Sequence, residues 1–320
     1  MSLTNMKVFN AQLQTMTIET LAQQVEKFNA ASAGAIVLTN QGFEGDYRFE
    51  NFFASLHAAQ RRVDRYGTNT TASPTNLAQL QEIGVKVAGG FGPIAWEPSQ
   101  LSWVMANPAA ALEAISRNLS EAIMKDQLNT AISAAVAAIE AQGTANVFDT
   151  GTGPITYGAI NSAHAKFGDS SSLLVADIMD GVQYHALVGQ NLTNTAELFN
   201  YQGVLVVEIL GKRVVVTDAP ALRETGTGAD AKVLSLVQGG VTVYDGSDLI
   251  TNIETSNGNQ RITTTMQADY AFGVAVKGFQ WDVTSGGKSP TDGDIETGSN
   301  WDKVATSVKH TAGVLTTGPI

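Results

Sequence analysis

A single stretch, residues 108–142, has the pattern of one very long amphipathic helix. Asn107 and Pro108 suit the start of a helix, and Gly143 suits the position just past its end. An apolar residue recurs every three or four positions with one skip, at Leu112, Ile115, Leu119, Ile123, Leu128, Ile132, Val136 and Ile139. At 1.5 Å per residue, such a helix is about 50 Å long. A compact monomer of 320 residues has little use for such a rod, so the pattern favours an extended, plate-like subunit.

The composition also favours a protein that is covered by copies of itself. Only 15% of the residues are charged, below the ~25% of an ordinary soluble domain, while 43% are hydrophobic. A monomer needs charge on its surface, so we expect neighbouring copies to cover much of this one. The net charge of −11 argues against a dedicated nucleic-acid-binding protein, which carries a basic stripe. It does not argue against a protein that encloses nucleic acid without binding it tightly.

Several kinds of chemistry are not expected. The chain has no cysteine, so neither disulfides nor thiolate metal sites hold the fold together. No apolar run reaches the ~18 residues of a membrane span, and the start, MSLTNMKVFN, lacks the charged-then-apolar order of a signal peptide. We therefore expect synthesis in the cytoplasm and no membrane partner.

Three elements are predicted around the long helix on its N-terminal side. Residues 17–31 have helical spacing of apolar positions but precede any core, so they predict an arm that must lie on something else. Residues 35–40, AIVLTN, predict a strand. Residues 82–96, EIGVKVAGGFGPIAW, predict one or two strands around a glycine-rich bend.

The segment between these strands is rich in aromatic residues. Nine of the chain's 23 aromatic residues (12 Phe, 7 Tyr and 4 Trp) lie between Phe43 and Trp103. Residues 47–66 predict a second helix that Gly67 ends, and it places Phe49, Phe52, Phe53, Leu56, Val63 and Tyr66 near one face.

The C-terminal half has a different character. Residues 154–168 and 181–192 predict helices on either side of a strand at 172–179. Residues 201–220 predict two strands with a turn at Leu210–Gly211, and 232–246 continue the alternation, so this half is a mixed α/β unit. Residues 261–283 predict two antiparallel strands, followed by a glycine- and acid-rich stretch at 284–300.

No catalytic constellation stands out from the sequence. GGKSP at 286–290 lacks the glycine that a phosphate loop needs five positions earlier, so it predicts a surface turn. The four histidines, His57, His164, His185 and His310, are far apart in sequence. Ordinary surface or helix-capping roles are therefore favoured over a metal site or a catalytic triad.

Asp218 raises the sharpest question about chemistry. It follows the buried valine run of GKRVVVTDAPAL and precedes Pro220, a position where many enzymes place a catalytic carboxylate. Asp180 and His185 could approach it only if several coincidences hold. A turn or cap residue that accepts hydrogen bonds from the backbone amides following the strand is the simpler interpretation.

One basic cluster, RRVDR at 61–65, has two interpretations. It forms a solvated helix face, or it forms ion pairs with an acidic neighbouring subunit, which the −11 balance favours. Together with the aromatic residues nearby, it supplies our candidate contacts between subunits: Phe49, Phe52, Phe53, Arg61, Arg62, Arg65, Trp96 and Trp103.

The order of these elements resembles the major capsid proteins of tailed bacteriophages, which have the HK-ninety-seven-type fold. The likeness runs from residue 1 to about 283. It rests on six segments taken together: MSLTNMKVFN, TLAQQVEKFNAAS, EPSQLSWVMANP, DQLNTAISAAVAA, YHALVGQNL and GKRVVVTDAPAL.

This resemblance implies an α+β capsid fold made of distinct regions. These are an N-terminal arm at 1–34, an extended loop region at 35–100, a peripheral domain at 101–142 that holds the long "spine" helix and regains strands at 251–283, and an α/β axial domain at 143–250. The C-terminal tail, 284–320, extends past the resemblance.

The resemblance also implies a function. Copies would tile an icosahedral shell as pentamers and hexamers around packaged double-stranded DNA, without sequence-specific binding, and the protein would reside in the virion. Scaffold, portal and decoration proteins are further possible partners; no cofactor, metal or catalytic residue is implied.

Some family members cross-link a lysine to an asparagine, but no motif here identifies such a pair. Two alternatives stay open: an α/β enzyme or ligand-binding domain centred on 143–250, and a nanocompartment shell of the same fold.

Overall fold

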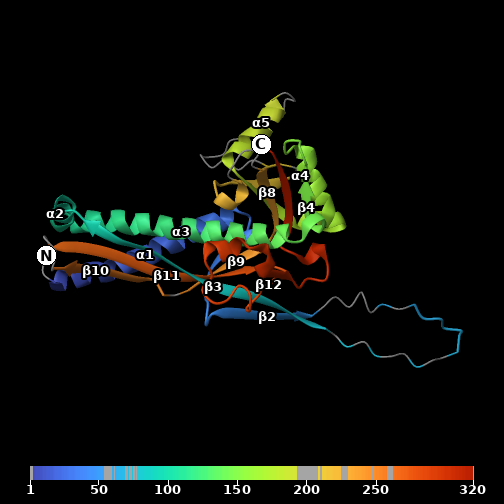
Figure 1. Cartoon of the computed structure of the whole chain (residues 1–320), viewed down its shortest axis with the longest axis horizontal. Helices are drawn as coiled ribbons and strands as arrows, with labels where there is room; N and C mark the ends of the chain where they lie inside the picture. The colour runs from blue at the N-terminus through green and yellow to red at the C-terminus, as the bar shows by residue number, and fades with distance from the viewer. Residues whose placement is uncertain are drawn as a thin grey trace.

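The chain folds into an elongated molecule built on two β-sheets and one long helix (Figure 1). The computed structural model describes residues 3–53, 62–68, 78–192, 211–224, 230–246, 248–257 and 262–319, together with residues 60, 71, 74, 76, 208 and 209. A long sheet and two long helices extend toward the N-terminal end, and residues 62–68 project at the opposite end (Figure 1).

The predicted long helix is present as α3, Pro108–Glu140, with 33 residues. Pro108 occupies its first turn as expected, but the Asn107 side chain makes no capping hydrogen bond. The last third of α3 is buried on all sides because it is rich in alanine, and it passes through the main core. Its first half keeps one face exposed, so the rod extends beyond the core of the molecule.

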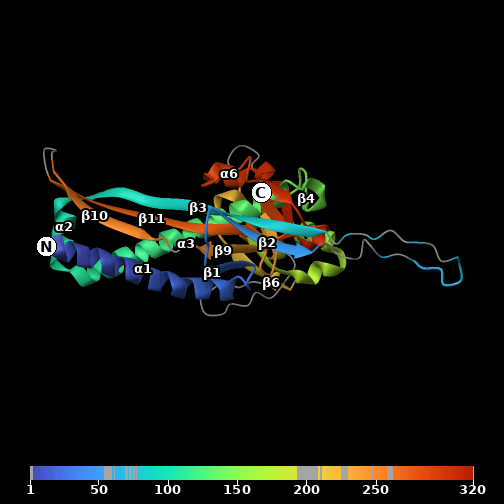
Figure 2. The same ribbon diagram turned by 90° about the horizontal axis from the view of Figure 1, so that it is seen from below.

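The N-terminal arm is a longer helix than expected and lies on its own chain. Helix α1 spans Leu3–Ala31, 29 residues, and it packs against α3 and two strands of the long sheet (Figure 2). Phe9 and Leu13 are buried in the main core, and the Ser120 hydroxyl on α3 donates to the Thr17 carbonyl at 3.0 Å. The surface that the arm requires is therefore supplied largely by the same molecule.

The long sheet has eight strands. Its order is β1-β9-β11-β3-β12-β13, with β10 added to β11 and β2 added to β3. The strands are β1 (Ile36–Gly42), β2 (Tyr47–Phe53), β3 (Gln79–Trp96), β9 (Val241–Asp245), β10 (Ile250–Ser256), β11 (Thr263–Val276), β12 (Phe279–Trp281) and β13 (Trp301–Lys303).

One prediction for this region is wrong. The segment 47–66 is not a helix: its first part forms β2, paired antiparallel with β3 from Tyr47↔Val85 to Phe53↔Gln79. The stretch 261–283 contains two antiparallel strands, β11 and β12, as predicted, and β3 lies between them in the sheet. In both cases the pairing partner, β3, is far away in sequence. Residues 82–96 form part of this one continuous strand rather than two.

The second sheet has six strands in the order β4-β14-β8-β5-β7-β6. Helices α4 (Tyr157–His164) and α5 (Gly181–Leu192) adjoin it, as the sequence predicts. The strands are β4 (Val147–Asp149), β5 (Leu174–Met179), β6 (Glu208–Ile209), β7 (Lys212–Val216), β8 (Asp230–Val237) and β14 (Gly313–Pro319).

The C-terminal tail is an integral part of the fold. Strand β14 lies inside the second sheet, between β4 and β8. Upstream of it, helix α6 (Asp292–Glu296) packs on α3, and the fully buried rings of Trp281 and Trp301 meet edge to face at 4.9 Å. The chain thus orders its own glycine-rich tail.

Candidate assembly surfaces

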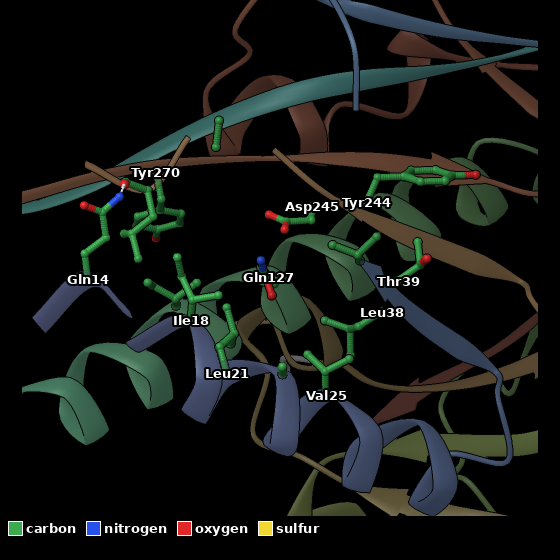
Figure 3. Close-up of a pocket in the computed structure, with 15 residues that line it drawn as sticks. Gln14, Ile18, Leu21, Val25, Leu38, Thr39, Gln127, Tyr244, Asp245 and Tyr270 are labelled. Carbon is green, nitrogen blue, oxygen red and sulfur yellow. Dashed lines mark hydrogen bonds between the residues drawn. The ribbon is translucent and has the colours of Figure 1, made fainter. Parts of the chain in front are cut away.

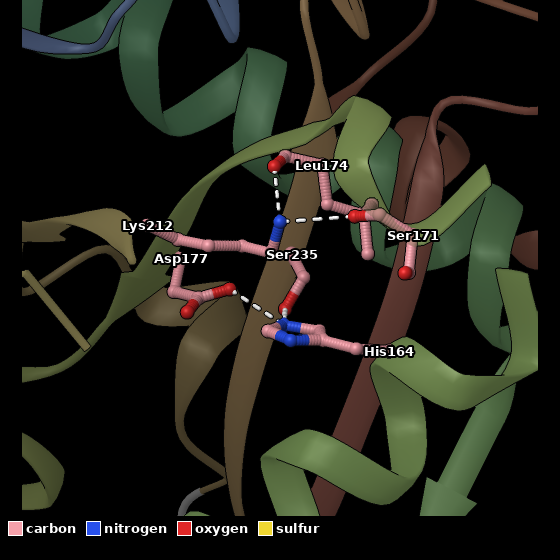
Figure 4. A network of polar contacts seen from close by, with 6 residues as sticks. All are labelled: His164, Ser171, Leu174, Asp177, Lys212 and Ser235. Atoms are coloured by element: carbon pink, nitrogen blue, oxygen red, sulfur yellow. Dashed lines mark hydrogen bonds and ion pairs between the residues drawn. The ribbon is translucent and has the colours of Figure 1, made fainter. Parts of the chain in front are cut away.

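A buried polar network in the second sheet carries the three residue types of a catalytic triad. His164 on α4, Asp177 on β5 and Ser235 on β8 lie together, and all three are buried (Figure 4). The Nε2 atom of His164 lies 3.1 Å from Asp177 Oδ1 and 3.0 Å from Ser235 Oγ. A triad needs one ring nitrogen for the serine and the other for the carboxylate, so this arrangement cannot relay a proton between them. It ties a helix to two strands.

For His164 the expected surface or helix-capping role is wrong, because its ring is buried and its partners come from distant segments. The available signal was Asp177, a carboxylate inside the otherwise apolar strand LLVADIM. Lys212 lies near the network and donates to the carbonyls of Ser171 at 2.9 Å and Leu174 at 2.5 Å. Burial lowers the pKa of the Lys212 amine, and the nearby Asp177 carboxylate opposes that effect.

Asp218 is a structural residue, as its sequence context favours. Its Oδ1 accepts the backbone N–H of Gly181 at 3.2 Å, at the start of α5. A side-chain hydrogen bond with Asp180, followed by the Gly181 amide, lowers the pKa of the exposed Asp218 carboxyl. His185 packs edge-on against Tyr184 instead of joining these acids. The carboxyl pair therefore caps a helix, and Arg223 Nη1 approaches it at 3.4 Å from Asp180 Oδ2.

The phosphate-loop candidate and the metal-site candidates do not form sites in the structure. Lys288 of the GGKSP stretch lies in a turn and pairs with Asp46 at 3.0 Å. Within the described residues there is no group of three or more side chains that could hold a metal ion. In the same part of the chain, no helix is long and apolar enough to cross a membrane.

Two grooves lie along the long sheet. One, of about 420 Å³, separates α1 from β1, β9 and β11, and its lining is mainly apolar (Figure 3). The other, of about 660 Å³, is bounded by β2, β3, β9 and residues 305–310. Its two acids have partners: the Tyr244 hydroxyl donates to Glu50 at 3.2 Å, and Glu82 accepts the Gly278 amide at 2.7 Å.

Apolar side chains are exposed at the end of the molecule that carries the N-terminus. Trp103, on helix α2 (Pro98–Ala106), is 49% exposed, and Met105 on the same helix is also exposed. Ile94 near the end of β3 and Ile262 just before β11 are exposed as well, whereas Trp96 is half-buried. Exposed apolar groups gathered in this way are typical of surfaces that contact other proteins.

The projecting segment, residues 62–66, exposes both charge and apolar surface at the other end. Tyr66 is 100% exposed and Val63 is 64% exposed. Arg62 and Arg65 are exposed too, and neither forms an ion pair within the described part of the chain. Arg61 lies outside the described residues. The bland prediction of a solvated helix face is not met here, because the described part of this segment is not helical.

The three phenylalanines of β2 do not share a face. Because side chains alternate along a strand, Phe49 and Phe52 point to opposite sides of the sheet. Phe49 is 54% exposed, while Phe52 is half-buried and lines the larger groove. The side chain of Phe53 lies outside the described residues. The contact roles of these residues, and of the arginines and tryptophans named with them, stay predictions.

Comparisons with known proteins agree on one kind of protein. A family model described as Gp13-like, major capsid protein 13-like, matches residues 5–315. No curated protein matches the chain. Among solved structures, that of Mycobacterium phage Bobi has a TM-score of 0.53 at 12% identity, covering 90% of this chain and 89% of that one. The Cyanophage Pam1 capsid asymmetric unit has a TM-score of 0.52 at 13% identity, covering 88% and 90%.

A third structure extends the same likeness. The acidic stable capsid structure of Helicobacter pylori bacteriophage KHP30 has a TM-score of 0.51 at 10% identity, covering 89% of this chain and 87% of that one. At such low identities these likenesses show a shared fold. The family model, in contrast, matches nearly the whole sequence.

Proposed function

Because the chain belongs to the Gp13-like family of major capsid proteins, we propose that its copies assemble as pentamers and hexamers into an icosahedral shell that encloses double-stranded DNA. It is a structural protein of the phage capsid and not an enzyme. The family match over residues 5–315 carries this proposal. The elongated subunit, with exposed apolar groups at both ends, supports it, because such surfaces need partners.

The regions implied by the resemblance enter the proposal with their roles. The arm at 1–34 and the extended loop region at 35–100 reach along the shell, the spine helix and strands 251–283 build the peripheral domain, and 143–250 build the axial domain. Support comes from α3, which continues beyond the main core, and from residues 62–66, which project from the body.

The DNA is enclosed without sequence-specific contacts. A net charge of −11 gives the subunit no general attraction for phosphates. Retention of DNA then depends on the closed shell and not on base or backbone recognition. We expect the affinity of unassembled subunits for duplex DNA to be weak at physiological salt.

Electron microscopy and light scattering of the expressed protein test the proposal, with a scaffold protein supplied if assembly requires one. Closed shells or capsomers with five-fold and six-fold symmetry are expected. A stable monomer under every condition would contradict the assembly role. Shells that copurify with a cargo enzyme instead of packaging DNA would contradict the DNA role and favour a nanocompartment.

A further inference from the structure

The groove between α1 and the long sheet contains a buried amide that has no partner. Gln127 on α3 lines this groove, and only 7% of its surface is exposed. Its side chain forms no hydrogen bond with another group in the described part of the chain, whereas the adjacent Asp126 accepts from Tyr270 at 2.6 Å. Figure 3 shows the Gln127 amide in the space between α1 and Asp245. A buried amide without a partner is costly, so this one needs a molecule in the groove to bind it.

The rest of the groove suits an apolar body. Aliphatic side chains of three elements line it: Leu21 and Val25 of α1, Leu38 of β1 and Ile123 of α3. Its volume of about 420 Å³ is in the range of small-molecule sites and holds on the order of ten waters. Such waters have mostly carbon atoms as neighbours, so their displacement by an apolar group is favourable.

The polar groups of the groove favour a neutral head group. Among the described residues that line it, only Asp245 carries a formal charge, and this carboxylate repels the head of an anion such as a fatty acid. The Gln127 amide offers two N–H donors and one carbonyl acceptor, which suit a hydroxyl or an amide. Asp245 and Ile18 are both exposed, so the groove is open to solvent beside them.

We propose that this groove binds a small, neutral, amphipathic molecule. Its hydroxyl or amide head hydrogen-bonds with Gln127, and its apolar body packs between α1 and β1. The ligand contacts α1, α3 and the sheet at once, so it holds the N-terminal helix on the body of its own subunit. A molecule that binds only the folded chain also stabilises it against unfolding. The site lies within one subunit, so this inference does not depend on the proposed assembly or on DNA packaging.

A fluorescent probe tests whether the groove binds such molecules. N-phenylnaphthylamine is neutral and fluoresces in apolar surroundings, and the natural full-length chain should bind it with saturation. Ala22→Trp, at an exposed position of α1 that lines the groove, fills its opening and should lose most of the signal. Ala11→Trp, at an exposed position of the same helix outside the groove, is the matched control and should keep it. Circular dichroism confirms that both variants are folded. Equal signals from the two variants, or no binding by the natural chain, would overturn the inference.

A matched series of competitors tests the role of Gln127. Phenylbutanol, butylbenzene and phenylbutanoate share one apolar body and differ in the head group. The alcohol should displace the probe from the natural chain and raise its melting temperature, and the carboxylate should compete more weakly. Gln127→Leu removes the amide and should weaken phenylbutanol by about three- to tenfold, which corresponds to one hydrogen bond, without weakening butylbenzene. Equal changes for these two competitors, or a carboxylate that competes as well as the alcohol, would contradict the proposed ligand chemistry.

Discussion

At the scale of single residues, a half-buried acid that joins two elements makes the stability of the fold depend on pH. Asp126 on α3 accepts a hydrogen bond from the Tyr270 hydroxyl on β11 at 2.6 Å. Burial is the main cause that raises the pKa of the Asp126 carboxyl above 3.8; the Tyr270 hydrogen bond opposes it, and Asp292 adds to it. The pair joins the spine helix to the long sheet, and the free energy of burying the Asp126 carboxyl is less favourable when it is ionised.

The sign of this dependence gives a prediction. A carboxyl whose pKa is raised by folding favours the folded state while it is protonated, so stability falls as pH rises from 3.8 through the raised pKa. Asp126→Asn keeps an oxygen that accepts from Tyr270 but cannot ionise. We expect this variant to be at least as stable as the natural chain at pH ~7 and to show a flatter stability profile from pH ~3.5 to ~7. Thermal melts across that range measure it; a steeper profile in the variant would contradict the assignment.

A second prediction at this scale concerns Asp218. Asp218→Asn retains an oxygen that can accept the Gly181 amide, so only a small decrease in melting temperature is expected, with assembly preserved. Asp218→Ala, which removes the acceptor, should lower the melting temperature further. An enzymatic activity that disappears in Asp218→Asn would contradict the capping role.

The sequence predicts a capping role for Asp218 but not its partner, because the carboxylate accepts the Gly181 amide from a distant segment and not an amide that follows its own strand. The sequence does not predict the network around His164 either. His164, Asp177 and Ser235 come from α4, β5 and β8, and only the antiparallel pairing of β5 with β8 brings Asp177 and Ser235 together. Periodicity along the chain carries no information on that pairing.

At the scale of elements, the sequence predicts those whose signals lie within one segment and fails for those decided by pairing with a distant strand. Helix α3 is predictable because its apolar spacing, its first-turn proline and its terminal glycine are all contained in one segment. The segment 47–66 misleads because its phenylalanines happen to have helical spacing, while the pairing of β2 with β3 decides the outcome. Strand β9 likewise follows β8 directly yet joins the other sheet, beside β1 and β11.

The C-terminal strand gives the prediction at this scale. Leu315 on β14 is fully buried in the main core, so Leu315→Ala should lower the free energy of unfolding by about 2–5 kcal/mol. Val283→Ala, at an exposed position upstream, is the matched control and should change it by less than about 0.5 kcal/mol. Denaturant unfolding measures both. Equal effects would mean that β14 does not stabilise the second sheet.

At the scale of the whole molecule, stability and assembly are expected to depend on different surfaces. The subunit contains its own core, which includes the N-terminal helix and the C-terminal strand, so we expect it to fold without neighbours. Exposed apolar groups lie at both ends, around Trp103 and in the projecting segment with Tyr66, and also between them, as at Phe49. Loss of side chains at these ends should therefore impair assembly while the fold is retained.

Two phenylalanines on opposite faces of β2 test this separation within one strand. Phe49 is exposed, so Phe49→Ala should leave the melting temperature nearly unchanged while assembly falls, because aromatic side chains buried at an interface contribute roughly 2 kcal/mol or more. Phe52 is half-buried against its own chain, so Phe52→Ala should lower the melting temperature. Sedimentation measures the assembly of each variant, and thermal melting measures its melting temperature. If Phe49→Ala assembled normally, the contact between subunits would lie elsewhere; if it unfolded, the side chain would serve the subunit's own core. A closed shell repeats each contact many times, so even a modest loss per subunit should be visible.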